Sequence, residues 1–186
     1  VADVAVLADG SSIITGHWNG TATFGNTSIT SSPSNYNDVF VAKLDANGNF
    51  VWVKQVGGTA SDEAAGIAVF GDGSSVVTGG FSGTVDFGVT TLTSTNHFRE
   101  IFVAKLDSDG NYLWASKAGG SGHDNVRDLT TIADGGIIIT GDYASTANFG
   151  SFSLDEFGSI SSFVAKLDAN GSFLWVTKAG ENQCCC

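Results

Sequence analysis

Short runs of apolar residues alternate with turns rich in glycine, asparagine and aspartate along the whole chain. Several runs, such as 39–42 and 50–53, are apolar at every position instead of alternating with polar residues. A strand carries apolar side chains on both faces when its sheet is covered on both sides. The pattern therefore predicts an all-β chain whose small sheets pack face to face.

Two blocks of sequence recur three times each. The first block occupies 38–52, 100–114 and 161–175, and the second occupies 8–16, 71–79 and 133–141. The interval from Phe40 to Asp72 is 32 residues, and so is the interval from Phe102 to Asp134. Recurrence at a fixed period is the signature of a repeat architecture. We place the units at 1–58, 59–120 and 121–183, followed by a cysteine tail at 184–186.

Each unit contains two expected hairpins and therefore four expected strands. Asn-Gly or Asp-Gly pairs, such as Asn47-Gly48, lie between the apolar runs and favour two-residue type I′ turns. Counting outward from this turn pairs Lys43 with Trp52 and Leu44 with Val51. Because the Lys–Trp pair recurs in every unit, we interpret it as structural.

Differences in length between the units are confined to one segment, which we expect to be a loop. It occupies roughly 26–39, 89–101 and 151–162. A short extra pair of strands is expected just before it, around Phe24, Phe87 and Phe149.

The run 38–52 and its copies, a Gly-Gly loop at 57–58 and 119–120, and the segments 66–69 and 76–79 resemble the bacterial SBBP-type β-propeller repeat. The resemblance spans essentially the whole chain and implies exported, modular surface proteins without known catalytic residues. The fold class that we predict is all-β, with three tandem four-stranded antiparallel units as propeller blades. Propellers usually have four to eight blades, so three would form an open arc or half of a six-bladed ring. A β-trefoil is a weaker alternative, because its units are shorter.

The chain is acidic, with a formal net charge of −11 and a pI near 4.3. Such a surface repels polyanions, so nucleic acid and anionic lipid are not expected partners. No apolar stretch approaches the roughly 20 residues of a spanning helix, so we expect no membrane insertion. We expect an extracellular or cell-surface location. The chain has no methionine, even at position 1, so we expect part of a longer gene product.

No zincin, P-loop, nucleophile-elbow or paired-cysteine motif occurs in the sequence, so we expect no enzyme. The adjacent Ser, His and Asp of 119–124 are interpreted as a connection between units, because catalytic triads converge from distant positions. The turns that begin at Asp45, Asp107 and Asp168 resemble the opening of a calcium loop but lack its glutamate at the twelfth position. We expect no cofactor, with calcium at these turns as the alternative.

Divergence between the units concentrates in the variable segment, whose residues are free to serve a partner instead of the fold. The candidate partner-binding residues are Tyr36, Asp38, His97, Phe98 and Arg99. The leading hypothesis is a non-catalytic extracellular scaffold or protein-interaction module. The alternatives are a carbohydrate-binding module and a structural subunit of an extracellular filament. Exposed sheet edges pair readily with other chains, so self-association or other protein chains are the expected partners, with glycans as another.

Overall fold

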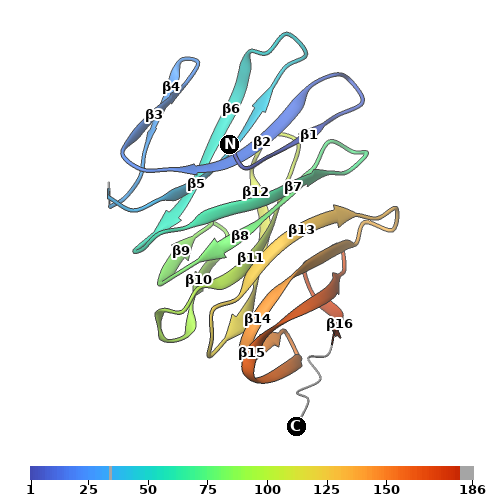
Figure 1. Ribbon diagram of the computed structural model, residues 1–186. Coiled ribbons are helices and arrows are strands. Elements are labelled where there is room, and N and C mark those ends of the chain that lie inside the picture. Colours follow the sequence, from blue (N-terminus) through green and yellow to red (C-terminus); the bar gives the residue numbers. More distant parts are fainter. Residues whose placement is uncertain (34, 181–186) are drawn as a thin grey trace.

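The computed structural model describes residues 1–33 and 35–180, which form antiparallel strands over most of their length (Figure 1). The one helix in these residues is the short 3-10 helix η1 (Thr95–His97). None of them forms a helix long and apolar enough to cross a membrane. The cysteine tail at 184–186 lies outside the described residues.

Four main strands, paired in sequence order, form each of three successive units. The first unit contains β1 (Asp3–Val6), β2 (Ser12–Trp18), β5 (Asp38–Leu44) and β6 (Phe50–Gly58). The second contains β7 (Glu63–Val69), β8 (Ser75–Phe81), β11 (Glu100–Leu106) and β12 (Tyr112–Gly120). The third contains β13 (Asn125–Thr131), β14 (Ile137–Phe149), β15 (Phe152–Leu167) and β16 (Phe173–Ala179). The predicted all-β class with three four-stranded units is confirmed.

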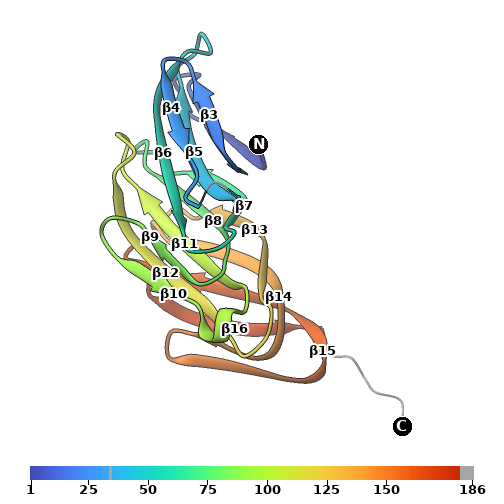
Figure 2. The ribbon, with the colours of Figure 1, turned by 90° about the vertical axis from the view of Figure 1, so that its left-hand side faces the viewer.

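The first strands of the three units lie side by side along one edge of the molecule. Strand β7 packs next to both β1 and β13, and the fourth strands β6, β12 and β16 lie at the other end of each unit's strand order. Figures 1 and 2 show the units following one another from the blue end of the chain to the red end. The units are therefore arranged as propeller blades.

The apolar core is divided between the two joints that connect neighbouring units. At the first joint, Val41 of β5 packs in one buried cluster with Phe81 and Phe102 of the second unit. At the second joint, Val103 of β11 belongs to a cluster with Tyr143 of the third unit. Adjacent residues of β11 thus enter opposite cores. This explains why the strand is apolar at every position, as the sequence pattern predicted.

A small hairpin extends each unit between its second and third main strands. In the first unit it consists of β3 (Thr21–Phe24) with β4 (Thr27–Thr30), and in the second unit of β9 (Thr84–Asp86) with β10 (Thr91–Thr93). In the third unit β14 and β15 continue through this region and remain paired as far as Phe149 and Phe152. The extra strand pair is confirmed. The predicted loop is wrong for most of 151–162, because backbone pairing with β14 over Phe152–Asp155 and again from Ile160 onward makes these residues part of β15.

The turn between the third and fourth main strands of each unit, the outer hairpin turn, differs from the predicted type I′ turn. In the first unit, Gly48 N–H donates to the Asp45 carbonyl oxygen at 3.0 Å. The Asp45 carboxylate accepts the N–H groups of Asn47 at 2.9 Å and Asn49 at 2.8 Å. Gly48 has a φ of 84°, whereas a type I′ turn requires a left-handed residue before it as well. The aspartate side chain therefore selects a longer turn with one left-handed glycine.

The register of this hairpin was predicted in part. Lys43 pairs with Trp52, as expected, but Leu44 pairs with Phe50 instead of Val51. The longer turn leaves Val51 as an extra residue in β6, and the same shift occurs in the other two units. A one-residue bulge of this kind redirects the side chains that follow it.

Glycine pairs at the ends of β6 and β12 join each sheet to the next. Gly58 pairs with Val85 of β9, and Gly119 pairs with Asn148 of β14. The Gly-Gly segment is therefore the end of a strand, and the prediction of a loop is wrong. A Cβ on Gly58 would lie 1.6 Å from the Thr84 carbonyl oxygen, so the two backbones approach this closely only with glycine.

Candidate functional site

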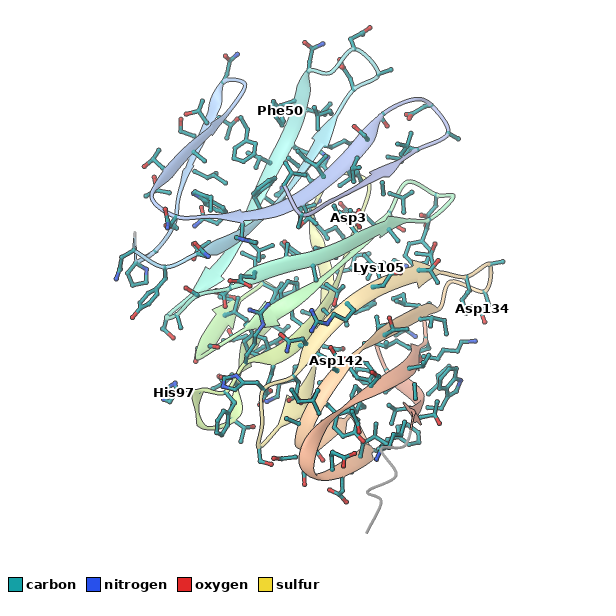
Figure 3. All side chains as sticks on the ribbon, viewed as in Figure 1. Asp3, Phe50, His97, Lys105, Asp134 and Asp142 are labelled. Carbon is teal, nitrogen blue, oxygen red and sulfur yellow. The ribbon has the colours of Figure 1, made fainter. Side chains whose placement is uncertain are left out.

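The candidate loop of the second unit connects β10 to β11 and includes η1. His97 lies exposed on this loop (Figure 3), with a left-handed φ of 60°. Phe98 is half-buried, and its ring meets the His123 ring edge-on with 5.3 Å between centroids. The Arg99 guanidinium turns back to the blade and forms an ion pair with Glu63 at 2.7 Å. The loop thus presents His97 to solvent, while Phe98 and Arg99 contact their own molecule.

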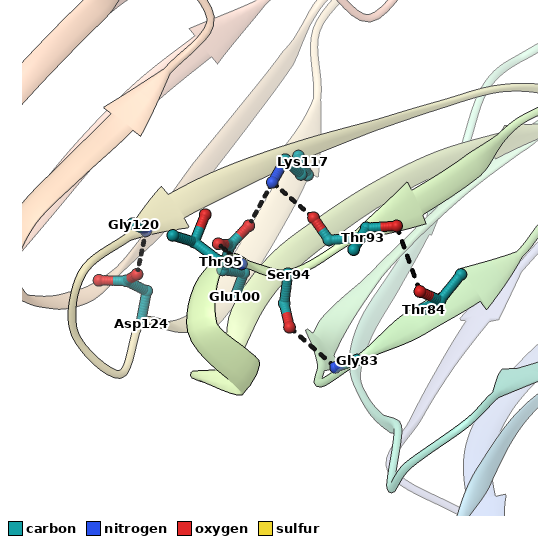
Figure 4. A network of polar contacts seen from close by, with 9 residues as sticks. All are labelled: Gly83, Thr84, Thr93, Ser94, Thr95, Glu100, Lys117, Gly120 and Asp124. Atoms are coloured by element: carbon teal, nitrogen blue, oxygen red, sulfur yellow. Dashed lines mark hydrogen bonds and ion pairs between the residues drawn. The ribbon is translucent and has the colours of Figure 1, made fainter.

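Glu100 holds this loop from inside the protein (Figure 4). Its side chain is fully buried, and Oε2 forms an ion pair with Lys117 Nζ at 2.9 Å. The other oxygen accepts the Thr95 N–H at 2.6 Å. Lys117 also donates to the Thr93 carbonyl oxygen at 2.7 Å. A buried carboxylate requires such paired neighbours, and here they fix the path of the loop.

The first unit has the same arrangement with different side chains. Asp38 is 1 % exposed, and its Oδ2 accepts the Gln55 amide at 2.8 Å and the Ser32 N–H at 3.1 Å. Asp38 therefore takes the place of Glu100, and Gln55 takes that of Lys117. Burial raises the pKa of Asp38, against the opposing hydrogen bonds from Ser32 and Gln55. This candidate residue therefore anchors its loop from a buried position, and its role in binding a partner stays a prediction.

A second carboxyl group lies beneath each loop, in the connection between units. Asp62 and Asp124 are both fully buried. The Asp62 N–H donates to the Asn37 carbonyl oxygen at 2.7 Å, and the Asp124 N–H donates to the Arg99 carbonyl oxygen at 2.9 Å. Asp124 Oδ2 accepts the Gly120 N–H at 2.9 Å. Each candidate loop is therefore fastened to the connection that follows it.

Both of these connection carboxyls hold their protons more tightly than an exposed aspartate does. Burial, together with the nearby Asp38 carboxyl, raises the pKa of Asp62 to about 8. Burial also raises the pKa of Asp124 to about 7, with a smaller contribution from Glu100. Two acidic groups meet beneath each loop, and ionising both would leave like charges in a poorly hydrated site.

The candidate residues are thus divided between two loops of successive units. Tyr36, which is 40 % exposed, and His97 form the exposed parts, whereas Asp38, Phe98 and Arg99 contact the blades. Sequence reasoning missed the anchors in the connections. The recurrence of an acidic residue at the same place in two units was the signal that could have found them.

The turns considered for calcium use their carboxylates within the hairpin. Asp107 accepts the N–H groups of Asp109 at 2.9 Å and Asn111 at 2.8 Å. Hydrogen bonds from Asn111, its side chain first, lower the pKa of Asp107. Across residues 1–33 and 35–180, no three or more His, Cys, Asp or Glu side chains gather where a metal ion could be shared. Calcium at these turns stays a prediction.

The chain is similar to a protein that carries WD repeats. An uncharacterized WD repeat-containing protein of Acanthamoeba polyphaga mimivirus is 29 % identical to it over 169 residues. The match covers 79 % of this chain, which spans only 12 % of that protein's length. No protein-family model matches the chain. The likeness and the three blades agree on a propeller-type repeat, whereas the SBBP type and a bacterial source stay predictions.

Proposed function

We propose that the chain is a non-catalytic interaction module whose blades present the loop residues 35–38 and 93–99 to a protein partner. The observation that carries this proposal is the contrast in solvent exposure between the residues of each loop. Tyr36 is 40 % exposed and His97 is exposed, whereas Asp38 and Glu100 are 1 % and 0 % exposed. A loop held in place before binding loses less conformational freedom when a partner arrives. The likeness to a WD repeat-containing protein supports a repeat module of this kind.

The proposal places the module outside the cell, as part of an exported bacterial surface protein. The SBBP-type resemblance supports this location, and the net charge of −11 favours solubility. Fractionation of the producing cells with compartment markers tests it. Recovery of the protein with cytosolic markers alone would overturn this part of the proposal.

A pair of variants tests the loops themselves. The double variant Tyr36→Ala and His97→Ala is expected to lose at least tenfold in affinity for a protein ligand of the wild-type chain, measured by surface plasmon resonance. Leu113→Ala is the matched control, because Leu113 is 52 % exposed and lies next to the Leu106 end of β11, away from the loop that precedes Glu100. Turnover of a substrate by the purified chain, or equal losses in both variants, would contradict the proposal.

A carbohydrate ligand is the second candidate, and it is favoured by the exposed ring of Tyr36, because aromatic faces stack on sugar rings. A glycan array separates the two candidates. Glycan binding that is lost in Tyr36→Ala would replace the protein partner by a carbohydrate.

A further inference from the structure

A tryptophan makes the same kind of contact at each of the two joints between units. At the first joint, Trp52 Nε1 of β6 donates to the Ser108 carbonyl oxygen at 3.3 Å. At the second joint, Trp114 Nε1 of β12 donates to the Ala169 carbonyl oxygen at 3.0 Å. Both carbonyl groups belong to the second residue of the outer hairpin turn in the following unit. The indole of each unit therefore lies on the turn of the next.

The glycine of that turn makes room for the indole. A Cβ on Gly110 would lie 2.9 Å from Trp52 Cδ2, and a Cβ on Gly171 would lie 2.6 Å from Trp114 Cε3. Both glycines are buried, although hairpin turns normally face solvent. At the second joint, Ser116 Oγ also donates to the Gly171 carbonyl oxygen at 2.7 Å. Tryptophan and turn glycine thus form the two complementary halves of a joint.

The third unit exposes the tryptophan half. Trp175 occupies the position of Trp52 and Trp114 and is 40 % exposed, whereas the other two pack against the cores of the joints. Val164 of β15 is partly exposed as well, whereas Val103 at the same position of the second unit is fully buried.

The first unit exposes the turn half. Gly48 is exposed, and a Cβ placed on it would meet nothing within 4 Å. Phe50 is 38 % exposed, whereas Tyr112 at the same position of the second unit packs against the first core. A groove of about 410 Å³ lies beside this turn, with Gly48 and Phe50 in its lining. Phe50 lies in the first unit, at the opposite end of the molecule from the third (Figure 3).

We propose that a second copy of this chain docks head to tail on these faces, with Trp175 of one copy on the Gly48 turn of the other. By analogy with the internal joints, the indole N–H donates to the Ala46 carbonyl oxygen. Thr177, at the position of Ser116, donates to the Gly48 carbonyl oxygen. Each copy carries both halves, so two copies close a six-bladed ring or several copies form a filament. The inference rests on the proposed interaction role, but it uses the blade faces and not the loops.

The outer face of the third unit is less apolar than the corresponding internal faces. Ser162 is exposed at the position where Val39 and Ile101 are fully buried in the other units. Its hydroxyl group donates to Asp142 Oδ1 at 3.1 Å. Because less apolar area is available for burial, the contact between copies is weaker than an internal joint and depends on concentration.

Sedimentation equilibrium of the purified chain tests this proposal, with a reducing agent present to prevent cross-links through Cys184–Cys186. The average mass is expected to rise above that of one chain as the concentration increases. Trp175→Ala and Gly48→Asn should each weaken the association at least tenfold, because tryptophans commonly dominate interfaces. Asparagine tolerates the left-handed φ of 84° at Gly48, so the turn is retained. Tyr36→Ala is the matched control, since Tyr36 and Trp175 are both 40 % exposed.

Mixing the two variants tests the direction of the contact. Trp175→Ala retains the turn half and Gly48→Asn retains the tryptophan half, so an equimolar mixture should form pairs that neither variant forms alone. A chain that stays monomeric at every concentration would overturn the proposal and assign these faces to another unit or protein. Association that survives both variants would also overturn it. Ligand binding by the loops should be normal in Trp175→Ala, which separates a failure here from a failure of the proposed function.

Discussion

Aspartate side chains stabilise this protein in two opposite ionisation states. Those in hairpin turns, such as Asp72 and Asp107, accept hydrogen bonds from the turn, and these bonds lower their pKa. Those beneath the loops, Asp62 and Asp124, are buried, and burial raises their pKa. The turn aspartates therefore favour folding as anions, and the buried ones favour folding as neutral acids.

The free energy of unfolding is expected to fall as the pH rises from about 5 to about 8. The pKa of Asp62 is about 8 in the folded protein and near 3.8 in the unfolded chain, so the folded state binds the extra proton between these values. This stabilisation is complete below the unfolded pKa and disappears as the pH passes the folded pKa, at no more than about 1.4 kcal/mol per pH unit for each group. Urea denaturation across this range provides the measurement.

The matched variant for this pH dependence is Asp62→Asn together with Asp124→Asn, which keeps the shape of both side chains without a titrating proton. The double variant should show a flatter dependence than the wild type over the same range. The turn aspartates do not interfere, because their lowered pKa values act at more acidic pH. An equally steep dependence in the double variant would rule out these two carboxyls as the cause.

Gly58→Ala is expected to destabilise the protein by about 1–3 kcal/mol, because the added Cβ overlaps backbone and the two strands must separate. The overlap would be with the Thr84 carbonyl oxygen, at 1.6 Å. Gly71→Ala is the control, since nothing lies within 4 Å of a Cβ at that position. Thermal or urea unfolding of the two variants gives the comparison. Equal stabilities would show that the glycine is not required for the contact between the sheets.

At the scale of the strands, the sequence predicts most elements because glycine turns delimit apolar runs. The pairing of Lys43 with Trp52 was predictable by counting, but the bulge at Val51 was not, because it depends on hydrogen bonds from the Asp45 side chain. The strand β15 was missed because differences in length between the units indicated a loop there, whereas Phe152–Asp155 pair with β14. Backbone pairing between these neighbouring strands thus decided that the segment is a strand, which the pattern of lengths did not indicate.

Lys117→Ala is expected to loosen the loop at 93–99 and to destabilise the fold by about 1–3 kcal/mol. The substitution leaves the buried Glu100 carboxylate without its ion-pair partner, and the cost is reduced because Lys117 is 39 % exposed. Hydrogen exchange of the Thr95 amide reports on the loop, and urea unfolding reports on the fold. Lys117→Gln is the control, since Gln55 holds Asp38 in the first unit. An alanine variant as stable and as protected as the glutamine variant would contradict this role.

At the scale of the whole molecule, the cores belong to pairs of units and not to single units. Val41 contributes to the first joint with Phe102, and Val103 contributes to the second joint with Tyr143. The face-to-face packing was predictable from strands that are apolar at every position. The buried anchors of the candidate loops were not, because their burial depends on the neighbouring connection and not on their own strand.

A fragment of residues 1–120 is expected to fold cooperatively, whereas residues 59–120 alone should not. The longer fragment retains the whole first core, in which Val41, Phe81 and Phe102 are fully buried. The shorter one leaves both faces of its sheet in water and lacks a partner for either. Circular dichroism with urea titration distinguishes the two outcomes. A cooperative transition in the shorter fragment would show that one unit is stable by itself.

The main-chain pairing of Gly58 with Val85 and of Gly119 with Asn148 has a consequence for how such arrays diversify. Hydrogen bonds between peptide groups do not depend on side-chain identity. This pairing between sheets therefore requires small residues on one strand and places few other constraints on the sequence. Substitutions elsewhere on the surface then leave this strand pairing intact. Exposed residues away from these glycines are therefore expected to tolerate substitution while the arrangement of the three units stays the same.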